Sequence, residues 1–236
     1  MDDALALPMP RRIVVTGCPR SGTGHIAALL RRLGISCGHA EHFNPQRLEL
    51  GVPPWPSELA GEASWYAAPY GECLPAGTVV VHIVRSPSAA LASLWRSRLF
   101  CTRSTDRSFL ERHAPVLMRG TPLQQTARIW SQWNQLAETA RETTGMRYLR
   151  VRLEALDESS LRWIAALAER ELDLERARSA VAELSRSTAQ TAREAVDSLA
   201  EWSDLRGTDL LREIDELAAR YGYGPAALSG LLARRA

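Results

Sequence analysis

The stretch from Arg12 to Gly34 most constrains what this chain can fold into. A run of β-branched residues, Ile13 to Thr16, ends at Gly17 and is followed by the tight turn CPRSGTG. After the turn, apolar residues recur at the spacing of one helical face until Gly34, a residue typical of helix C-caps. A strand, a glycine-containing turn and a helix in this order direct the free N–H groups of the helix N-terminus at an anion such as phosphate. The sequence therefore predicts an anion-binding loop between a strand and a helix.

The turn is close to the phosphate-binding loop of ATP-using enzymes, G-x-x-x-x-G-K-[ST], but it lacks the lysine. Gly17 and Gly22 have the right separation, and Thr23 stands at the lysine position. The chain contains no lysine, so its 29 basic residues are all arginines, and the cation of this loop is Arg20. Because the missing lysine acts on the β- and γ-phosphates of ATP, we expect an anion-binding loop with a different chemistry.

Length and composition are those of one globular domain. The 236 residues can form a substantial core, and the net charge of +2 argues against a general nucleic-acid binder. No apolar run approaches the length of a membrane span, and the N-terminus lacks the apolar core of a secretory signal. The four cysteines are scattered without C-x-x-C spacing, which predicts neither a zinc site nor a disulfide framework. We therefore expect a cytoplasmic protein with one domain over 1–236 and a loose leader at 1–11.

Further strands and helices alternate along the chain. Residues 77–84 predict a second strand, apolar throughout as in parallel strands covered on both faces, and 147–151 predict a third. Residues 51–75 are expected to be irregular and rich in aromatic side chains. Further helices are expected from Ser86-Pro87 onward and over 121–143, 159–186 and 208–221. This alternation predicts an α/β fold with a doubly wound, mostly parallel sheet, on which the helices of 159–236 also pack.

A second informative stretch, VHIVRSPSAALASLW, follows the second predicted strand. Arg85 ends the strand, Ser86-Pro87 begins a helix, and Ser93 lies two helical turns further on. An arginine and a serine on the same side of such a corner can hold one phosphate from two directions, and Arg96 could join them from the same helical face. Taken alone, the stretch is equally compatible with an ordinary strand end and helix start.

Together, the two stretches resemble the PAPS-dependent sulfotransferases, particularly their bacterial members; PAPS is 3′-phosphoadenosine 5′-phosphosulfate. In that family a P-[KR]-S-G-[TS] loop holds the 5′-phosphosulfate, and an R-x-P-x-x-x-x-x-S segment holds the 3′-phosphate. Here the motifs are Pro19 to Thr23 and Arg85, Pro87 and Ser93. The resemblance runs from about Arg12 to Leu156 and includes W-x-x-W-N at 130–134.

The resemblance implies a P-loop NTPase-like, three-layer α/β/α fold with extra C-terminal helices. It also implies PAPS as co-substrate, adenosine 3′,5′-bisphosphate (PAP) as product, and no metal. The nucleotide-binding residues that it implies are Pro19, Arg20, Ser21, Gly22, Thr23, Gly24, Arg85 and Ser93. A sulfuryl group in transfer carries less charge than a phosphoryl group, so a divalent metal is less needed. Arg20 and the N–H groups of Ser21 to Gly24 are suited to stabilise negative charge on the departing phosphate, although Arg20 could also be an ordinary solvated loop residue.

An acceptor hydroxyl also needs a base within hydrogen-bond reach. Related bacterial enzymes show G-H-E after the first helix, whereas this chain has Gly38-His39-Ala40-Glu41-His42, so the acid is displaced or replaced. We favour Glu41 as the catalytic base, then His42, then His39. Histidine has the more convenient pKa, and Glu41 would need desolvation or a hydrogen-bonding partner.

Several tryptophans have two interpretations each. Trp65 could wall an acceptor pocket, since aromatic faces suit sugars and ring systems, or it could fill the core. Trp130 and Trp133 share one helical face and are expected in the core. Asn134 on that face would be a buried polar group with either structural partners or a cofactor.

These observations favour a sulfotransferase that moves a sulfuryl group from PAPS to a hydroxyl, or an amine, of a small-molecule, lipid or carbohydrate acceptor. No nucleic-acid or membrane-spanning role is expected, and a homodimer is compatible with the sequence. One alternative is a P-loop kinase-like enzyme with a displaced cation. The other is a non-catalytic nucleotide-binding partner protein.

Overall fold

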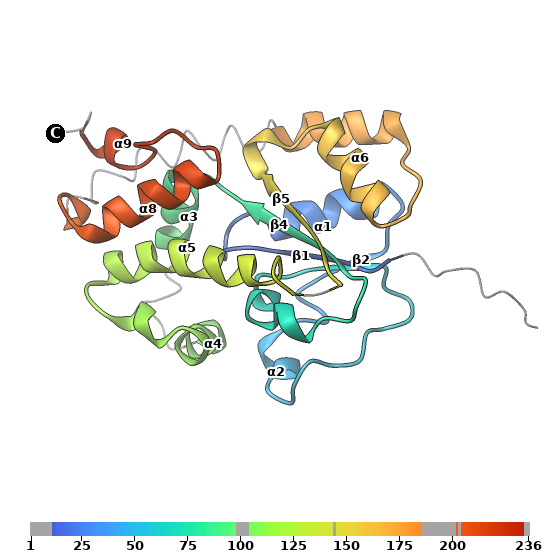
Figure 1. Cartoon of the computed structure of the whole chain (residues 1–236), viewed down its shortest axis with the longest axis horizontal. Coiled ribbons are helices and arrows are strands. Elements are labelled where there is room, and N and C mark those ends of the chain that lie inside the picture. Colours follow the sequence, from blue (N-terminus) through green and yellow to red (C-terminus); the bar gives the residue numbers. More distant parts are fainter. Residues whose placement is uncertain (1–10, 98–103, 144, 186–201, 203, 234–236) are drawn as a thin grey trace, which may run out of the picture.

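A sheet of five parallel strands runs through the part of the chain that the computed structural model describes, residues 11–97, 104–143, 145–185, 202 and 204–233 (Figure 1). The strand order is β2-β3-β1-β4-β5. The strands are β1 (Ile13–Thr16), β2 (Cys37–His39), β3 (Gly61–Ala63), β4 (Val79–Val84) and β5 (Arg147–Arg152). The expectation of an α/β fold with a parallel sheet is therefore confirmed.

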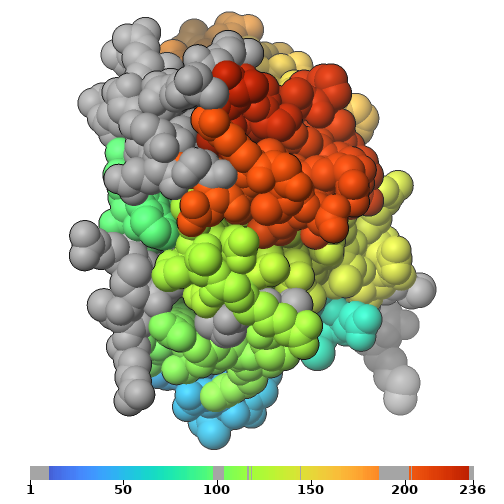
Figure 2. All heavy atoms as spheres, turned by 90° about the vertical axis from the view of Figure 1, so that its left-hand side faces the viewer, coloured from blue at the N-terminus to red at the C-terminus, as the bar shows by residue number. Residues whose placement is uncertain are grey.

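Helices cover both faces of the sheet, which gives three layers (Figure 1). Ile13 and Val15 of β1 pack on one side with α1, α6 and residues 174–185, whereas Val14 packs on the other with α3, α4, α5 and α8. Figure 2 shows α8 (orange-red) lying against α5 (yellow-green) on that second face. The helices are α1 (Thr23–Arg32), α2 (Pro45–Leu48), α3 (Pro87–Ser97), α4 (Thr105–His113), α5 (Pro122–Thr139), α6 (Glu158–Leu167), α8 (Asp209–Arg220) and α9 (Ser229–Ala233). Short 3-10 helices are η1 (Trp65–Cys73), η2 (Pro115–Met118) and η3 (Leu153–Ala155).

The sequence pattern missed two of the strands. β2 and β3 have three residues each, which is too short for a periodic signal, and β3 lies inside the stretch 51–75 that was expected to be irregular. β3 nevertheless pairs with β1 on one side and β2 on the other, so that Glu62 lies beside Val14 and Gly38. Most of the rest of that stretch is the 3-10 helix η1 and the loops around it.

Helix boundaries also differ from the sequence prediction. The helix predicted over 159–186 is broken: α6 ends at Leu167, Glu169 adopts a left-handed φ of 57°, and a new helix starts at residue 174. α5 begins after the Thr121 capping box and ends four residues short of the predicted 143. Of the predicted leader, 1–10 lie outside the described residues, and Arg11 is attached to the fold because its N–H donates to the Ala168 carbonyl at 3.2 Å.

The core contains the helix face that carries two tryptophans. Trp130 and Trp133 are fully buried, as predicted. The Asn134 side chain donates to the Trp130 carbonyl at 2.8 Å, and its Oδ1 lies 3.0 Å from Nε2 of the buried His82, so its partners are structural. No helix in the described part of the chain has both the length and the apolar character that a bilayer crossing requires.

Candidate functional site

The loop between β1 and α1 is built on two glycines that no other residue could replace without strain. Gly17 has φ 154°, and a Cβ atom there would lie 2.2 Å from the Ile83 carbonyl oxygen of the neighbouring strand β4. Gly22, the N-cap of α1, has φ 103°, and its Cβ would lie 2.7 Å from the Leu153 side chain. Backbone conformation and close packing therefore both require glycine at these positions.

Arg20 lies between these glycines in a left-handed conformation, with φ 68°. This conformation is unfavourable by about 1–2 kcal/mol for a residue with a Cβ atom, and such strain is concentrated at functional sites. It sends the Arg20 side chain toward α3, where its Nε donates to Ser93 Oγ at 3.0 Å. A left-handed residue in such a turn also brings successive N–H groups toward one side, an arrangement that binds anions.

A cavity of about 530 Å³ opens in front of this loop. Its lining comes from Arg20, Gly22, Thr23, Gly24, His25, Ala28, His39, Ala40, Trp65, Tyr66, Arg85 and Ser93. The cavity lies at the carboxyl ends of the strands, beside β1. After β1 the chain continues to β2 at one edge of the sheet, whereas after β4 it continues to β5 at the other edge. Such a switch point is where ligands bind in open α/β sheets. Of the nucleotide-binding residues expected from the sequence, Pro19 and Ser21 are buried and do not line the cavity.

Arg85 is the most deeply buried cation of the cavity, with an exposed fraction of 7%. Its Nη1 donates to the Arg20 carbonyl at 3.1 Å, and within the described residues it forms no ion pair. Burial lowers the pKa of Arg85; the Glu154 carboxylate, which accepts the N–H of the next residue Ser86, opposes this shift, and Arg20 reinforces it. A buried guanidinium without a paired anion is unfavourable, so this site favours a ligand with negative charge.

Hydrogen bonds to the backbone fix the corner that presents Arg85. Trp130 Nε1 donates to the Arg85 carbonyl at 3.0 Å. Glu154 accepts the Ser86 N–H at 2.9 Å and the Tyr223 hydroxyl at 2.7 Å, which joins this corner to the chain segments after β5 and α8. The W-x-x-W-N stretch and the segment that carries Glu154 therefore act on the site through the backbone around Arg85.

His39 is the only one of the three candidate bases that lines the cavity. Its Nε2 is 3.5 Å from Thr23 Oγ1, and its ring approaches α1 because Gly24 has no side chain: a Cβ there would be 3.0 Å from His39 Cε1. Partial burial, with a contribution from Arg31, lowers the pKa of His39, while Glu41 opposes the shift. The imidazole is therefore neutral near pH 7 and can accept a proton.

The structure gives no support to the preference for Glu41 and then His42. Glu41 is exposed and does not line the cavity. His42 is buried, with its ring 4.8 Å from Phe43 and 5.1 Å from Trp55 between centroids, and its nitrogens have no hydrogen-bond partner among the described residues. Both residues follow Ala40, the last residue of this loop that lines the cavity.

Sequence reasoning missed the residue that organises this loop. Glu62 of β3 is fully buried, and its Oε1 accepts the N–H groups of Glu41 at 2.8 Å and His42 at 3.0 Å. Burial raises the pKa of Glu62, although these backbone N–H groups act in the opposite direction. Gly38 is required here because its Cβ would be 2.0 Å from Glu62 Oε2. The only signal for this role in the sequence was an acidic residue between Gly61 and Ala63, and it could not be interpreted because strand β3 was not predicted.

His25 was also missed. It lies on the first turns of α1 and lines the cavity. Its pKa is lowered by burial and then by the positive charges of Arg85 and Arg20, which places it at the cationic side of the cavity.

Aromatic side chains form another part of the cavity wall. Trp65 is half-buried and packs against Tyr66 with ring centroids 3.8 Å apart. Trp133 Nε1 donates to the Trp65 carbonyl at 2.8 Å, and the Tyr66 hydroxyl donates to Asp106 of α4. Trp65 therefore combines the two interpretations of the sequence, since it packs on the core and also faces the cavity.

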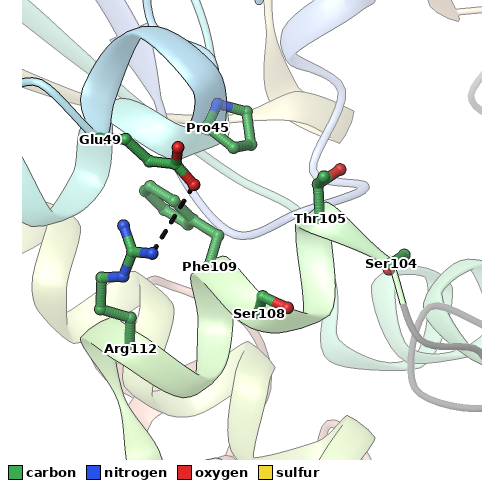
Figure 3. Close-up of a pocket in the computed structure, with 7 residues that line it drawn as sticks. All are labelled: Pro45, Glu49, Ser104, Thr105, Ser108, Phe109 and Arg112. Carbon is green, nitrogen blue, oxygen red and sulfur yellow. Dashed lines mark ion pairs between the residues drawn. The ribbon is translucent and has the colours of Figure 1, made fainter.

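A second hollow of about 330 Å³ lies between α2 and α4 (Figure 3). Figure 3 shows Glu49 and Arg112 reaching toward each other across it, with a separation of 3.7 Å between Oε1 and Nη2. Both side chains are exposed and already paired, so the described residues of this hollow provide no buried unpaired charge comparable with Arg85. It is lined by Pro45, Glu49, Ser104, Thr105, Ser108, Phe109 and Arg112.

No protein-family model and no curated protein gives a significant match to this chain. Within the described residues, no three His, Cys, Asp or Glu side chains gather closely enough to hold a metal ion. The case for a function therefore rests on the geometry and chemistry of the cavity.

Proposed function

We propose that this protein binds PAPS and transfers its sulfuryl group to a hydroxyl group of an acceptor. The observation that carries the proposal is the meeting of Arg20, Arg85 and Ser93 in one cavity, although 73 residues separate Arg20 from Ser93. The buried Arg85 guanidinium has no ion-pair partner among the described residues, and this favours an anionic ligand. The β1–α1 loop supplies a second anion-binding group, so the cavity favours a ligand that carries two anionic groups.

Each part of the cavity has a role in this proposal. The N–H groups and Arg20 of the loop would hold the 5′-phosphate, and Arg85 with Ser93 would hold the 3′-phosphate. In the unliganded protein Arg20 Nε donates to Ser93 Oγ at 3.0 Å, and contacts of these two side chains with the phosphates of the bound nucleotide would replace this hydrogen bond. PAPS, when bound, supplies a sulfuryl group joined to its 5′-phosphate.

His39 would act as the base, because of the three candidate bases it alone lines the cavity, where its Nε2 lies 3.5 Å from Thr23 Oγ1 of the loop. As the acceptor oxygen forms its bond to sulfur, His39 takes the hydroxyl proton. The bond from sulfur to the bridging oxygen breaks at the same time, and the electron pair leaves with the bisphosphate. Arg20 and the loop N–H groups stabilise the negative charge that develops on the departing bisphosphate. Stabilisation of this kind is usually the largest electrostatic contribution to catalysis.

Calorimetric titration with adenosine 3′,5′-bisphosphate, AMP and MgATP tests the binding part of the proposal. We expect the bisphosphate to bind at least about 10-fold more tightly than AMP, since only it engages Arg85 and Ser93 through a 3′-phosphate. Ser93→Ala should reduce this preference and leave AMP affinity unchanged. Equal affinity for AMP and the bisphosphate would contradict the proposal, and tighter binding of MgATP would favour a kinase-like enzyme.

The role of His39 is tested by bisphosphate release from PAPS with a mixed panel of alcohols and phenols. His39→Asn should lower the rate about 100-fold or more and leave bisphosphate affinity within about 3-fold. The acid limb of the pH–rate profile should have its midpoint below 6.5, since the pKa of His39 is lowered. The matched control is His42→Asn, which should keep the profile. A His39→Asn protein with the wild-type rate would rule out this base.

A further inference from the structure

We propose that the acceptor is an electrically neutral hydroxy compound with a flat apolar face, and that the cavity discriminates against anionic acceptors. The inference rests on the proposed function and narrows its acceptor. It follows from how charge and aromatic surface are distributed across the cavity.

The order of the strands separates the cavity into two sides. Arg85 follows β4, on one side of the β1–α1 loop, and Ser93 lies on the helix after it. Trp65 follows β3 and His39 ends β2, both on the opposite side of that loop. A nucleotide held between the loop and Arg85 therefore leaves the Trp65–His39 side for the second substrate.

The two sides differ in charge. Arg20 and Arg85 supply the cations of the nucleotide side, together with the titratable His25. Among the residues that the structure describes, the lining of the acceptor side consists of Ala28, His39, Ala40, Trp65 and Tyr66, of which only His39 titrates near neutral pH.

Charges outside the lining do not change this asymmetry. Outside the lining, Arg31 and Glu41 influence the pKa of His39 with opposite signs; the other titratable group that influences it is His25, within the lining. Arg31 is also engaged, because its Nη1 donates to the Cys37 carbonyl at 3.2 Å. On the acceptor side, a carboxylate or sulfate would thus lose water without gaining a cationic partner from the described residues that line that side, and it would lie near the negative donor.

The aromatic wall of the acceptor side is already held in place. The Trp65 ring has edge contacts with Phe109 and Trp133 at centroid distances of 5.8 Å and 5.4 Å. The Tyr66 hydroxyl is occupied by Asp106 and so is not a free donor for the acceptor. What the wall offers is therefore ring surface, which suits a flat apolar face and requires little rearrangement on binding.

Two compounds that differ by one carboxylate test the inference. We would measure binding of 2-naphthol and 6-hydroxy-2-naphthoate to the protein saturated with adenosine 3′,5′-bisphosphate, by calorimetry at pH 7.5. We expect 2-naphthol to bind at least about 10-fold more tightly, a difference of about 1.4 kcal/mol. Trp65→Ala should abolish its binding, whereas Trp163→Ala, which removes a tryptophan that is 64% exposed and outside the cavity, should not.

A charge introduced on the acceptor side should reverse the preference. Ala28 lies one turn after Gly24 on α1, on the face that meets His39. Ala28→Arg should bring the carboxylate at least to the affinity of 2-naphthol, whereas Ala28→Gln, with similar bulk and no charge, should not. Ser108→Arg, in the second hollow, controls for added charge elsewhere.

Three results would overturn the inference while leaving the proposed function intact, provided that the bisphosphate binds: equal or tighter binding of the carboxylate, no binding of either compound, or an unchanged preference in Ala28→Arg. Failure of the bisphosphate itself to bind would instead refute the proposed function.

Discussion

Replacing Arg85 with methionine should affect ligand binding and protein stability in opposite directions. The side chain is 7% exposed and has no ion-pair partner among the described residues. Removing one partner of a buried, hydrogen-bonded charge pair weakens binding by about 2–5 kcal/mol, which corresponds to a roughly 30-fold to several-thousand-fold increase in Kd. Arg85→Met should therefore raise the Kd for adenosine 3′,5′-bisphosphate by at least about 30-fold.

The same substitution removes from the unliganded protein a buried charge that has no ion-pair partner in the described part of the chain. Well-packed apolar replacements of buried charges are neutral or stabilising by about 1–4 kcal/mol. Methionine keeps most of the side-chain volume, and the Trp130 hydrogen bond is made to the backbone of residue 85 and should persist. Tm should therefore stay the same or rise by a few degrees, since about 1 kcal/mol corresponds to roughly 2–4 °C at this chain length.

Calorimetric titration and thermal unfolding of the same samples test both expectations, with Arg112→Met as the control for loss of an exposed arginine. An Arg85→Met protein that binds the bisphosphate within about 3-fold of wild type would refute the assignment of Arg85. A Tm lower by ten degrees would show that Arg85 is structural.

Three further predictions concern the scaffold of the site. Gly17→Ala should lower the free energy of unfolding by about 3 kcal/mol, because the added Cβ would clash with the Ile83 carbonyl. The control is Gly34→Ala, at φ 79° with open space around the Cβ, which should lower the free energy of unfolding by only about 1 kcal/mol. Equal losses of stability in urea melts of the two variants would contradict the clash. Burial lowers the pKa of His82 from 6.5 to about 4, so its contribution to stability is fully present above pH 6.5 and is lost as pH falls toward 4. It amounts to about 3 kcal/mol, and urea melts of His82→Gln should lack that part of the pH dependence; a slope like that of wild type would show that His82 does not titrate in this range. Glu62→Ala should lower the free energy of unfolding by about 1–3 kcal/mol, because two backbone N–H groups lose their acceptor, and it should slow PAPS turnover while bisphosphate affinity changes by no more than about 3-fold. Glu62→Gln, which keeps one oxygen acceptor, should lower stability and turnover less. A weakened bisphosphate affinity in either variant would contradict the division of the cavity into a nucleotide side and an acceptor side.

The sequence was most informative where local rules and chemistry coincide. The β1–α1 loop could be predicted because Gly17 and Gly22 occupy positions that a side chain cannot. The strand at 77–84 could be predicted because parallel strands buried on both faces are apolar throughout. The burial of Trp130 and Trp133 followed from helical periodicity alone.

The sequence was least informative where tertiary contacts determine local structure. β2 and β3 form from three residues each because neighbouring strands supply their hydrogen bonds, and no period can be detected over that length. The orientations of His39 and His42 depend on the buried carboxylate of Glu62, which holds the N–H groups after His39. Three titratable residues within four positions were therefore indistinguishable in sequence, although only one faces the cavity.

The division of the cavity into a nucleotide side and an acceptor side is the central claim, and a crystal structure with adenosine 3′,5′-bisphosphate would test it most directly. We expect the 5′-phosphate within hydrogen-bond distance of the N–H groups of Gly22 to Gly24, and the 3′-phosphate on Arg85 and Ser93, with the Arg20–Ser93 hydrogen bond replaced. A nucleotide bound on the Trp65–His39 side, or with its 3′-phosphate away from Arg85, would contradict the account.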